Sequence, residues 1–324
     1  MQLLKTSTMP IQRQDLDLIS ALRRNIESVI FGKTEVVKLA VTCLLARGHV
    51  LLEDVPGIGK TALARAIAKS IACAFRRIQF TPDLLPSDVT GVTIFDAERK
   101  DFAFKKGPIF SNIILADEIN RATPRTQAAL LEAMNENRVS VDGTTHALPS
   151  PFLVIATQNP LEFTGTYPLP ESQLDRFLMI LKMGYPTAEE ERQIITSRAG
   201  NDPVEALQAV LTADDVHRLS ERVNAVRVDD AITDYVIEIA NRTRADRTLV
   251  AGVSPRGAIH LTRAARAYAL VDGRDFITPD DIKAVAVNVL SHRVVEKRSR
   301  ASQDGRVASG QILRKILQEI PVPQ

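Results

Sequence analysis

The stretch Val50-Leu51-Leu52-Glu53-Asp54-Val55-Pro56-Gly57-Ile58-Gly59-Lys60-Thr61 decides the fold of this chain. A short apolar run leads into a glycine-rich loop that ends in a lysine and a threonine. The residues that follow, Ala62–Ala68, have the composition of a helix. A strand, a loop of this kind and a helix in that order are the context in which a phosphate-binding loop works.

Each part of this loop has a predicted chemical role. Backbone N–H groups of the loop and of the helix N-terminus cradle phosphate oxygens. Lys60 reaches the β- and γ-phosphates, and the Thr61 hydroxyl binds Mg²⁺. The predicted ligands are therefore ATP or ADP with Mg²⁺. The loop residues expected to contact the nucleotide are Pro56, Gly57, Ile58, Gly59, Lys60, Thr61 and Ala62. One position departs from G-x-x-x-x-G-K-[ST], because Asp54 replaces the first glycine.

Two adjacent acids form the second signal. The apolar run Ile113–Ala116 leads directly into Asp117 and Glu118, at the end of a strand where parallel sheets bind ligands. We expect Asp117 to contact the nucleotide and hold the Mg²⁺ shell opposite Thr61, and Glu118 to orient and deprotonate the attacking water. The alternative is a strand that simply ends in solvated acids, and the phosphate-binding loop upstream argues against it.

A polar amide follows another apolar run. Phe152–Thr157 reads as a buried strand, and Asn159 comes two residues later, before Pro160. Asn159 could hydrogen-bond the γ-phosphate or the attacking water, although an asparagine before proline also forms an ordinary turn. Two isolated arginines, Arg176 and Arg256, would by themselves be interpreted as surface residues or helix-end partners.

Short apolar runs alternate with helical patterns over the first part of the chain, which predicts an α/β fold with a parallel sheet sandwiched by helices. The predicted strands are His49–Leu52, Phe75–Phe80, Ile113–Ala116, Phe152–Thr157 and Phe177–Leu181. After Pro186 we expect no strand and a smaller all-helical domain. The predicted organisation is a tail at 1–13, an α/β domain at 14–186 and a helical domain at 187–324.

Two segments of the α/β domain look inserted, at about 92–107 and 138–149. The first carries aromatic residues among lysines and arginines. The second alternates polar and apolar residues around Asp142-Gly143, which predicts a hairpin with a tight turn.

Composition and charge argue against several classes of protein, among them secreted and membrane-spanning proteins. The chain has 324 residues, with 41 lysines and arginines against 39 acids, and its net charge of +2 gives no overall field for nucleic acid or membrane. The N-terminus lacks the pattern of a signal peptide, and no run is long enough to cross a bilayer. Cys43 and Cys73 are expected to be buried thiols in a reducing compartment. We therefore predict a cytoplasmic protein without membrane insertion.

Together these motifs resemble those of AAA+ ATPases. The segments that carry this resemblance are Pro56–Thr61, Ile113–Glu118, Asn159, Asp175-Arg176-Phe177 and Ser254-Pro255-Arg256. More narrowly, the chain is similar to the MoxR family from about residue 13 to residue 320. The segments that carry this narrower likeness are Leu51–Thr61, Asp117–Arg121, Gln127–Met134 and Tyr167–Phe177. Asp54 agrees with the phosphate-binding loop of that family.

The resemblance implies roles for residues that the pattern alone leaves open. Asn159 matches the sensor-1 position and Arg256 the sensor-2 position, while Arg176 matches the arginine finger, which acts on ATP held by a neighbouring subunit. With Lys60 and Glu118 these form the predicted catalytic set.

Further features take their meaning from the same family. Val29–Gly32 falls where relatives contact adenine, and Lys33 stands where glutamine is expected. The two inserted segments match the helix-2 insert and the pre-sensor-1 hairpin. Gln79 could restrain Glu118 until a client binds.

The predicted activity is ATP hydrolysis in a homo-oligomeric, hexameric ring that remodels, matures or activates client proteins. The resemblance implies a von Willebrand factor A domain protein as partner. One alternative is a chelatase motor subunit. Another is a helicase-like nucleic-acid motor, with Lys100, Lys105 and Lys106 near Phe102 and Phe104, but the charge balance argues against nucleic acid. A small-molecule kinase would leave Arg176 and the helical domain without a role.

Overall fold

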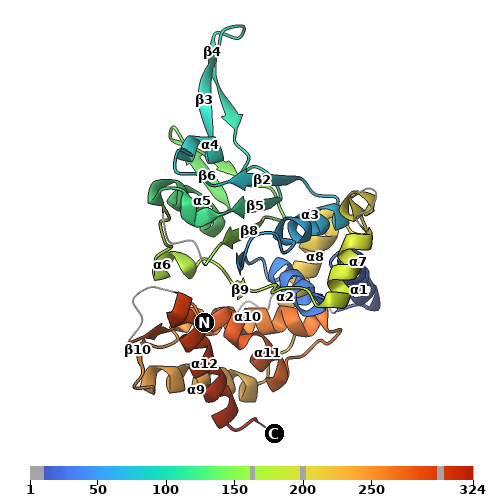
Figure 1. Cartoon of the computed structure of the whole chain (residues 1–324), viewed down its shortest axis with the longest axis vertical. Helices are drawn as coiled ribbons and strands as arrows, with labels where there is room; N and C mark the ends of the chain where they lie inside the picture. Colours follow the sequence, from blue (N-terminus) through green and yellow to red (C-terminus); the bar gives the residue numbers. More distant parts are fainter. Residues whose placement is uncertain (1–10, 161–164, 198–201, 298–302, 324) are drawn as a thin grey trace, which may run out of the picture.

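A five-stranded sheet forms the centre of the α/β half (Figure 1). The computed structural model describes residues 11–160, 165–197, 202–297 and 303–323, so most of the predicted tail lies outside the described residues. The strand order is β2-β5-β8-β1-β9, and all neighbouring pairs are parallel. The strands are β1 (Val50–Glu53), β2 (Phe75–Gln79), β5 (Ile113–Asp117), β8 (Leu153–Gln158) and β9 (Met179–Leu181). Each of the five predicted apolar runs contributes one of them.

Both faces of this sheet are buried because its strands are apolar on both sides. Leu52, Leu115 and Ile155 pack in a core with the helices α1 (Arg13–Glu27), α2 (Thr34–Leu45) and α3 (Lys60–Ser70). Their neighbours in sequence point the other way and pack with α4 (Pro86–Thr90) and α5 (Pro124–Glu136). The predicted helical sandwich is confirmed.

Both inserted segments are antiparallel hairpins. Strands β3 (Gly91–Asp96) and β4 (Asp101–Lys106) form an arm that projects from the body (Figure 1). Strands β6 (Arg138–Val141) and β7 (Thr144–Ala147) form the second hairpin, as predicted. Its turn residues Asp142 and Gly143 have φ of +49° and +79°. Two positive φ values in a two-residue turn match the right-handed twist of the strands.

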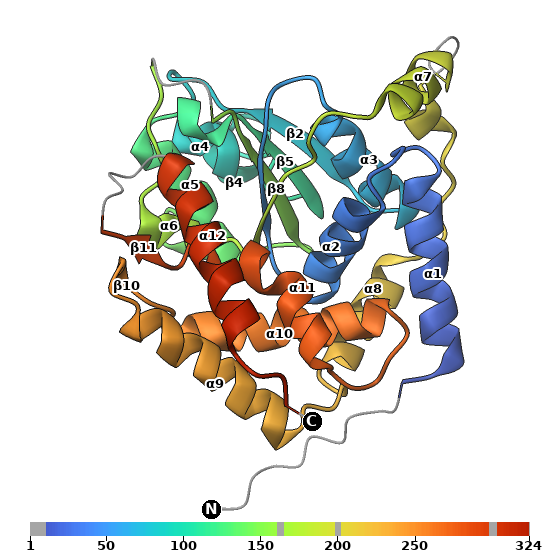
Figure 2. The same cartoon turned by 60° about the horizontal axis from the view of Figure 1, so that its bottom comes forward.

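The rest of the chain is largely helical, as predicted, and forms a lid domain (Figure 2). The expectation of no strand after Pro186 was wrong, because β10 (Leu249–Ala251) pairs with β11 (Val295–Glu296). Strands of three and two residues are too short to show an alternating pattern. The other elements are η1 (Ile119–Arg121), α6 (Glu171–Leu174), α7 (Ala188–Ser197), η2 (Pro203–Ala206), α8 (Ala213–Val223), α9 (Asp230–Ala245), α10 (Pro255–Val271), α11 (Pro279–Leu290) and α12 (Gln303–Glu319).

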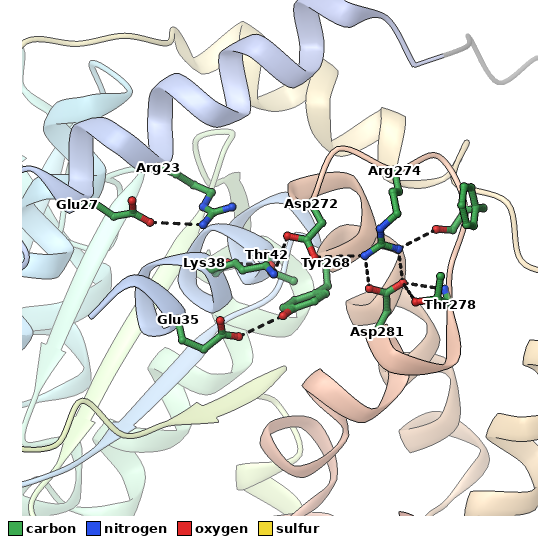
Figure 3. A network of polar contacts seen from close by, with 11 residues as sticks. Arg23, Glu27, Glu35, Lys38, Thr42, Tyr268, Asp272, Arg274, Thr278 and Asp281 are labelled. Atoms are coloured by element: carbon green, nitrogen blue, oxygen red, sulfur yellow. Dashed lines mark hydrogen bonds and ion pairs between the residues drawn. The ribbon is translucent and has the colours of Figure 1, made fainter. Parts of the chain in front are cut away.

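Side-chain caps fix the starts of two lid helices. The Ser254 hydroxyl accepts a hydrogen bond from the Gly257 N–H at 3.1 Å and so begins α10. At α11, the Asp281 carboxylate accepts one from the Thr278 N–H at 2.7 Å. Arg274 binds both oxygens of that carboxylate at 2.5 Å (Figure 3). This bidentate pair satisfies a side chain that is 2 % exposed.

The lid also contacts α2 through polar side chains (Figure 3). Lys38 Nζ on α2 lies 2.6 Å from a carboxylate oxygen of Asp272 and 3.8 Å above the Tyr268 ring. The Tyr268 hydroxyl donates to Glu35 at 3.3 Å. Burial opposes the charge on Lys38, but the hydrogen bonds to Asp272 and Tyr268 outweigh it and raise the pKa of Lys38. The lid is therefore joined to the α/β half by more than the chain around Pro186.

The two cysteines were both expected to be buried, and the chain was expected to have no helix that crosses a membrane. Cys43 is buried, whereas Cys73 is only half-buried. None of the described helices combines the length and the apolar composition needed to cross a bilayer.

Candidate nucleotide site

The loop between β1 and α3 has the backbone geometry that its glycines predict. Gly57 and Gly59 have φ of +85° and +97°, a region that side chains with a Cβ rarely adopt. Helix α3 begins at Lys60, immediately after Gly59. Its N-terminal N–H groups have no partner within the helix, and they carry the positive end of the helix dipole. This is a site suited to anionic oxygens.

A cavity of about 310 Å³ lies over this helix N-terminus. It brings together the loop, the acid that ends β5, the acid that follows it and the amide that follows β8, as the sequence predicts. The residues that line it are Pro56, Gly57, Gly59, Lys60, Thr61, Ala62, Arg77, Asp117, Glu118 and Asn159. Lys60 Nζ donates to the backbone carbonyl of Asp54 at 2.7 Å, which places the ammonium beside the loop.

Asp117 is held from two sides. One carboxylate oxygen accepts from the Thr157 hydroxyl at 2.5 Å, and the other accepts from Arg77 Nη2 at 2.6 Å. The Thr61 side chain lines the same cavity. A hydroxyl and a carboxylate are hard oxygen donors, and Mg²⁺ commonly takes one or two such protein ligands together with phosphate oxygens and water. The residues present therefore fit the predicted metal.

Glu118 sits on a strained part of the backbone. Its φ is +55°, in the left-handed region, where it caps the start of η1. Its N–H donates to the Thr157 hydroxyl at 2.9 Å, so one buried hydroxyl orients both acids. Its carboxylate accepts from Gln79 Nε2 at 3.0 Å and from Arg121 at 3.3 Å. The contact that the sequence suggested between Gln79 and Glu118 is present.

Sequence reasoning missed Arg77 and Thr157. Arg77 stands two residues before Gln79 on β2, so both side chains leave the same face of the strand. Gln79 pairs with Asp117 in the parallel register, which brings that face of β2 beside the acids. This alternation could have identified Arg77. Thr157 lies within a fully buried strand, and its sequence context gave no sign of a polar role.

A second cavity, of about 320 Å³, adjoins the first and shares four loop residues with it: Pro56, Gly57, Gly59 and Ala62. Ile58 lines this second cavity and not the first. So do Val29, Ile30 and Phe31, three of the four residues predicted to lie near adenine. The lining is mainly apolar, which suits a base and its sugar next to the phosphate cavity.

The hydrogen bonds of the Asp54 carboxylate explain why an aspartate replaces the first glycine of the loop pattern. One carboxylate oxygen accepts from the Gly184 N–H at 2.7 Å, and the other from the Val55 N–H at 3.0 Å. Gly184 belongs to the segment after β9 whose next two residues, Tyr185 and Pro186, line the second cavity. Lys33 holds the same segment by donating to the Tyr185 carbonyl at 2.9 Å. A glycine at position 54 could not make the carboxylate contact.

The structure does not bring Arg176 and Arg256 to these cavities. Arg176 lies between α6 and β9 and donates to the Leu131 carbonyl at 3.1 Å. The Arg256 side chain is 56 % exposed and lies 3.5 Å from a carboxylate oxygen of Asp175. Arg176 lines a separate hollow with Glu132 and Arg138, beside α5 and the β6–β7 hairpin, whereas Arg256 lies at the start of α10 in the lid.

Comparison with known proteins agrees with this architecture. Residues 49–179 match the model of the ATPase family associated with various cellular activities (AAA), and residues 241–316 match the AAA lid domain. Uncharacterized protein YeaC of Bacillus subtilis is 50 % identical, over 94 % of this chain and 95 % of its own. Chaperone MoxR1 of Mycobacterium tuberculosis is 42 % identical, over 92 % of this chain and 81 % of its own.

The solved structure of a putative ATPase from Cytophaga hutchinsonii superposes with a TM-score of 0.86 at 36 % identity, and the match covers 96 % of both chains. It shares both the α/β half and the lid, so the likeness extends beyond the loop motif. Together with the relatives above, it shows that the chain belongs to the MoxR family of AAA+ ATPases.

Proposed function

We propose that this chain hydrolyses ATP to ADP and phosphate and uses the reaction to remodel or mature client proteins. The observation that carries the hydrolysis is the single cavity in which Lys60 and Thr61 face Asp117 and Glu118. A phosphate-binding helix N-terminus, a metal-binding carboxylate and a second acid that can accept a proton are what phosphoryl transfer to water requires.

Each side chain has a task in this proposal. Lys60 balances charge on the β- and γ-phosphates, and Thr61 and Asp117 would hold Mg²⁺. The bound metal ion would neutralise charge that develops on the phosphate oxygens. Glu118 orients the attacking water and accepts its proton, with Asn159 beside it. The Gln79 contact holds the Glu118 carboxylate until a client binds, since the acid must release it to reach water.

Part of the site would come from a neighbouring subunit. Arg176 and Arg256 line neither cavity of their own chain, although the family resemblance assigns both to an ATP site. An arginine supplied by a neighbour stabilises charge in the transition state of phosphoryl transfer. This supports an oligomer in which each ATP lies between two subunits, and the hexameric ring follows the family resemblance. The chaperone role follows the name of the MoxR1 relative, and the von Willebrand factor A domain partner follows the family resemblance.

The Glu118→Gln variant tests the catalytic assignment. The amide keeps the shape of the side chain but cannot accept a proton, so ATP binding should persist while turnover falls by about 10²–10⁴. Nucleotide titration and steady-state phosphate release measure the two quantities. Glu98→Gln, a matched change at an exposed residue of the β3–β4 arm, should leave both unchanged. Normal turnover by Glu118→Gln would refute the role.

A further inference from the structure

Arg293 is a buried arginine that joins the lid to the segment carrying Arg176. It follows α11, and its side chain is 2 % exposed. Its Nε donates to the Asp175 carboxylate at 2.7 Å. The other two nitrogens donate to backbone carbonyls of the α/β half: those of Asp175 at 3.1 Å, Phe177 at 2.7 Å and Leu178 at 3.2 Å.

These contacts surround Arg176 in the sequence. Residues 175–178 lie between the end of α6 and the start of β9, outside regular secondary structure. Carbonyls in such a segment need partners from elsewhere, because no helix or sheet supplies them. The planar guanidinium offers five N–H donors in a fixed arrangement, so one side chain can set the path of several residues.

The surroundings of Arg293 are adapted to it. His260 Nδ1 lies 2.8 Å from Arg293 Nη2. Burial, together with the charge of Arg293, lowers the pKa of His260 to about 4, so that nitrogen is an acceptor at neutral pH. Burial also lowers the pKa of Arg293, to about 10, which leaves the guanidinium charged.

We propose that Arg293 is a positioning residue that sets Arg176 for action on ATP bound by the neighbouring subunit. Arg293 fixes the backbone on both sides of Arg176 and the carboxylate of Asp175, which also pairs with Arg256. The lid would thereby control how a subunit completes its neighbour's site, and not only how it covers its own nucleotide. The inference rests on the proposed shared site.

The test uses Arg293→Met, which removes the donors and keeps much of the volume. Because Arg293 lies outside both cavities, the variant should bind ATP like the wild type. Its turnover should fall on the order of 10²-fold, the effect of misplacing a catalytic group by about 1 Å. Arg274→Met is the control, because it breaks another arginine–carboxylate pair of the lid, one with a buried carboxylate, without touching residues 175–178. It should keep its turnover below its melting temperature.

Mixing subunits separates positioning from simple damage to the fold. Lys60→Ala subunits should not bind ATP, but they carry an intact Arg293 and Arg176. In mixed rings they should complete the sites of Arg293→Met subunits, so turnover should exceed the sum of the two proteins assayed apart. The double variant Lys60→Ala/Arg293→Met, mixed with wild type, should give no such gain.

A parallel mixture of Arg176→Ala with Lys60→Ala tests the shared site itself. Recovery there, without recovery of Arg293→Met, would overturn the inference and leave the proposed function intact. Failure of both mixtures would overturn the shared site and the inference with it. Full turnover by Arg293→Met alone would also overturn the inference. If Arg293→Met does not fold, Arg293→Lys carries the same tests, because it keeps the charge but offers one nitrogen in place of three.

Discussion

At the residue scale, His49 shows how burial can fix a protonation state. It is a buried residue whose Nε2 lies 3.0 Å from the Met134 carbonyl, while Nδ1 accepts from the Val154 N–H at 3.0 Å. Only the neutral ring with its proton on Nε2 satisfies both contacts. Burial, with a contribution from the charge of Arg263, lowers the pKa of His49 to about 4.

This shift predicts a loss of stability in acid. The unfolded chain takes up the proton near pH 6.5, so the contribution of His49 is complete above that pH and is lost as pH falls toward 4. The shift in the pKa of His49 from 6.5 to about 4 corresponds to a loss of about 3 kcal/mol in unfolding free energy between these pH values. Urea unfolding from pH 7 to pH 4 measures it. In His49→Gln, the unfolding free energy should fall less steeply with decreasing pH in this window. The decrease that remains includes the contribution of His260, whose pKa is also lowered. A pH dependence equal to that of the wild type would contradict the assignment.

At the scale of elements, the sequence predicted those elements whose burial or backbone geometry restricts the residue types that can form them. The five sheet strands are apolar on both faces, and the Asp142-Gly143 turn requires positive φ, so both leave a pattern. The β3–β4 arm exposes Phe95 and Phe102, and exposed aromatic residues among charges carry no burial pattern to read. The arginine contacts of Arg77 and Arg293 depend on which strands and helices become neighbours, which one sequence does not reveal.

Asp54 links two elements that are far apart in the sequence, the phosphate-binding loop and the segment after β9. Its carboxylate accepts from the Gly184 N–H, and Lys60 donates to its carbonyl, so one residue contacts both the segment beside the base cavity and the phosphate-binding lysine. If the loop moves when phosphate binds, the Asp54–Gly184 contact would therefore transmit that movement to the segment that leads into the lid.

Asp54→Ala should weaken both the fold and the site. A hydrogen bond to a charged group contributes about 1.5–3 kcal/mol, and its loss leaves the Gly184 N–H without this acceptor. We expect a lower unfolding free energy together with weaker ATP binding. Asp54→Asn, which keeps a carbonyl acceptor, should lose less. Chemical unfolding and nucleotide titration measure the two effects, and an Asp54→Ala protein as stable as the wild type would argue against this role.

At the scale of the whole molecule, several polar contacts fix the lid to the α/β half, and three of them lie near β9 and α2. Arg293 binds the segment before β9, Asn288 Nδ2 donates to the Ile180 carbonyl at 3.0 Å, and Lys38 pairs with Asp272. The core that includes α2 continues into the lid helices without a break. Any movement of the lid relative to the α/β half would have to break these polar contacts as well as separate apolar surfaces.

The junction at Lys38 should therefore show strong energetic coupling between the two halves. In a double-mutant cycle of Lys38→Met and Asp272→Asn, we expect a coupling of about 0.5–3 kcal/mol in unfolding free energy, toward the upper end because the ammonium is buried and also lies over Tyr268. The Arg23–Glu27 pair within α1, 3.5 Å apart, is the control (Figure 3). A pair one turn apart on a helix contributes about 0.3–0.5 kcal/mol. Coupling at the junction no larger than in α1 would mean that apolar packing alone holds the lid in place.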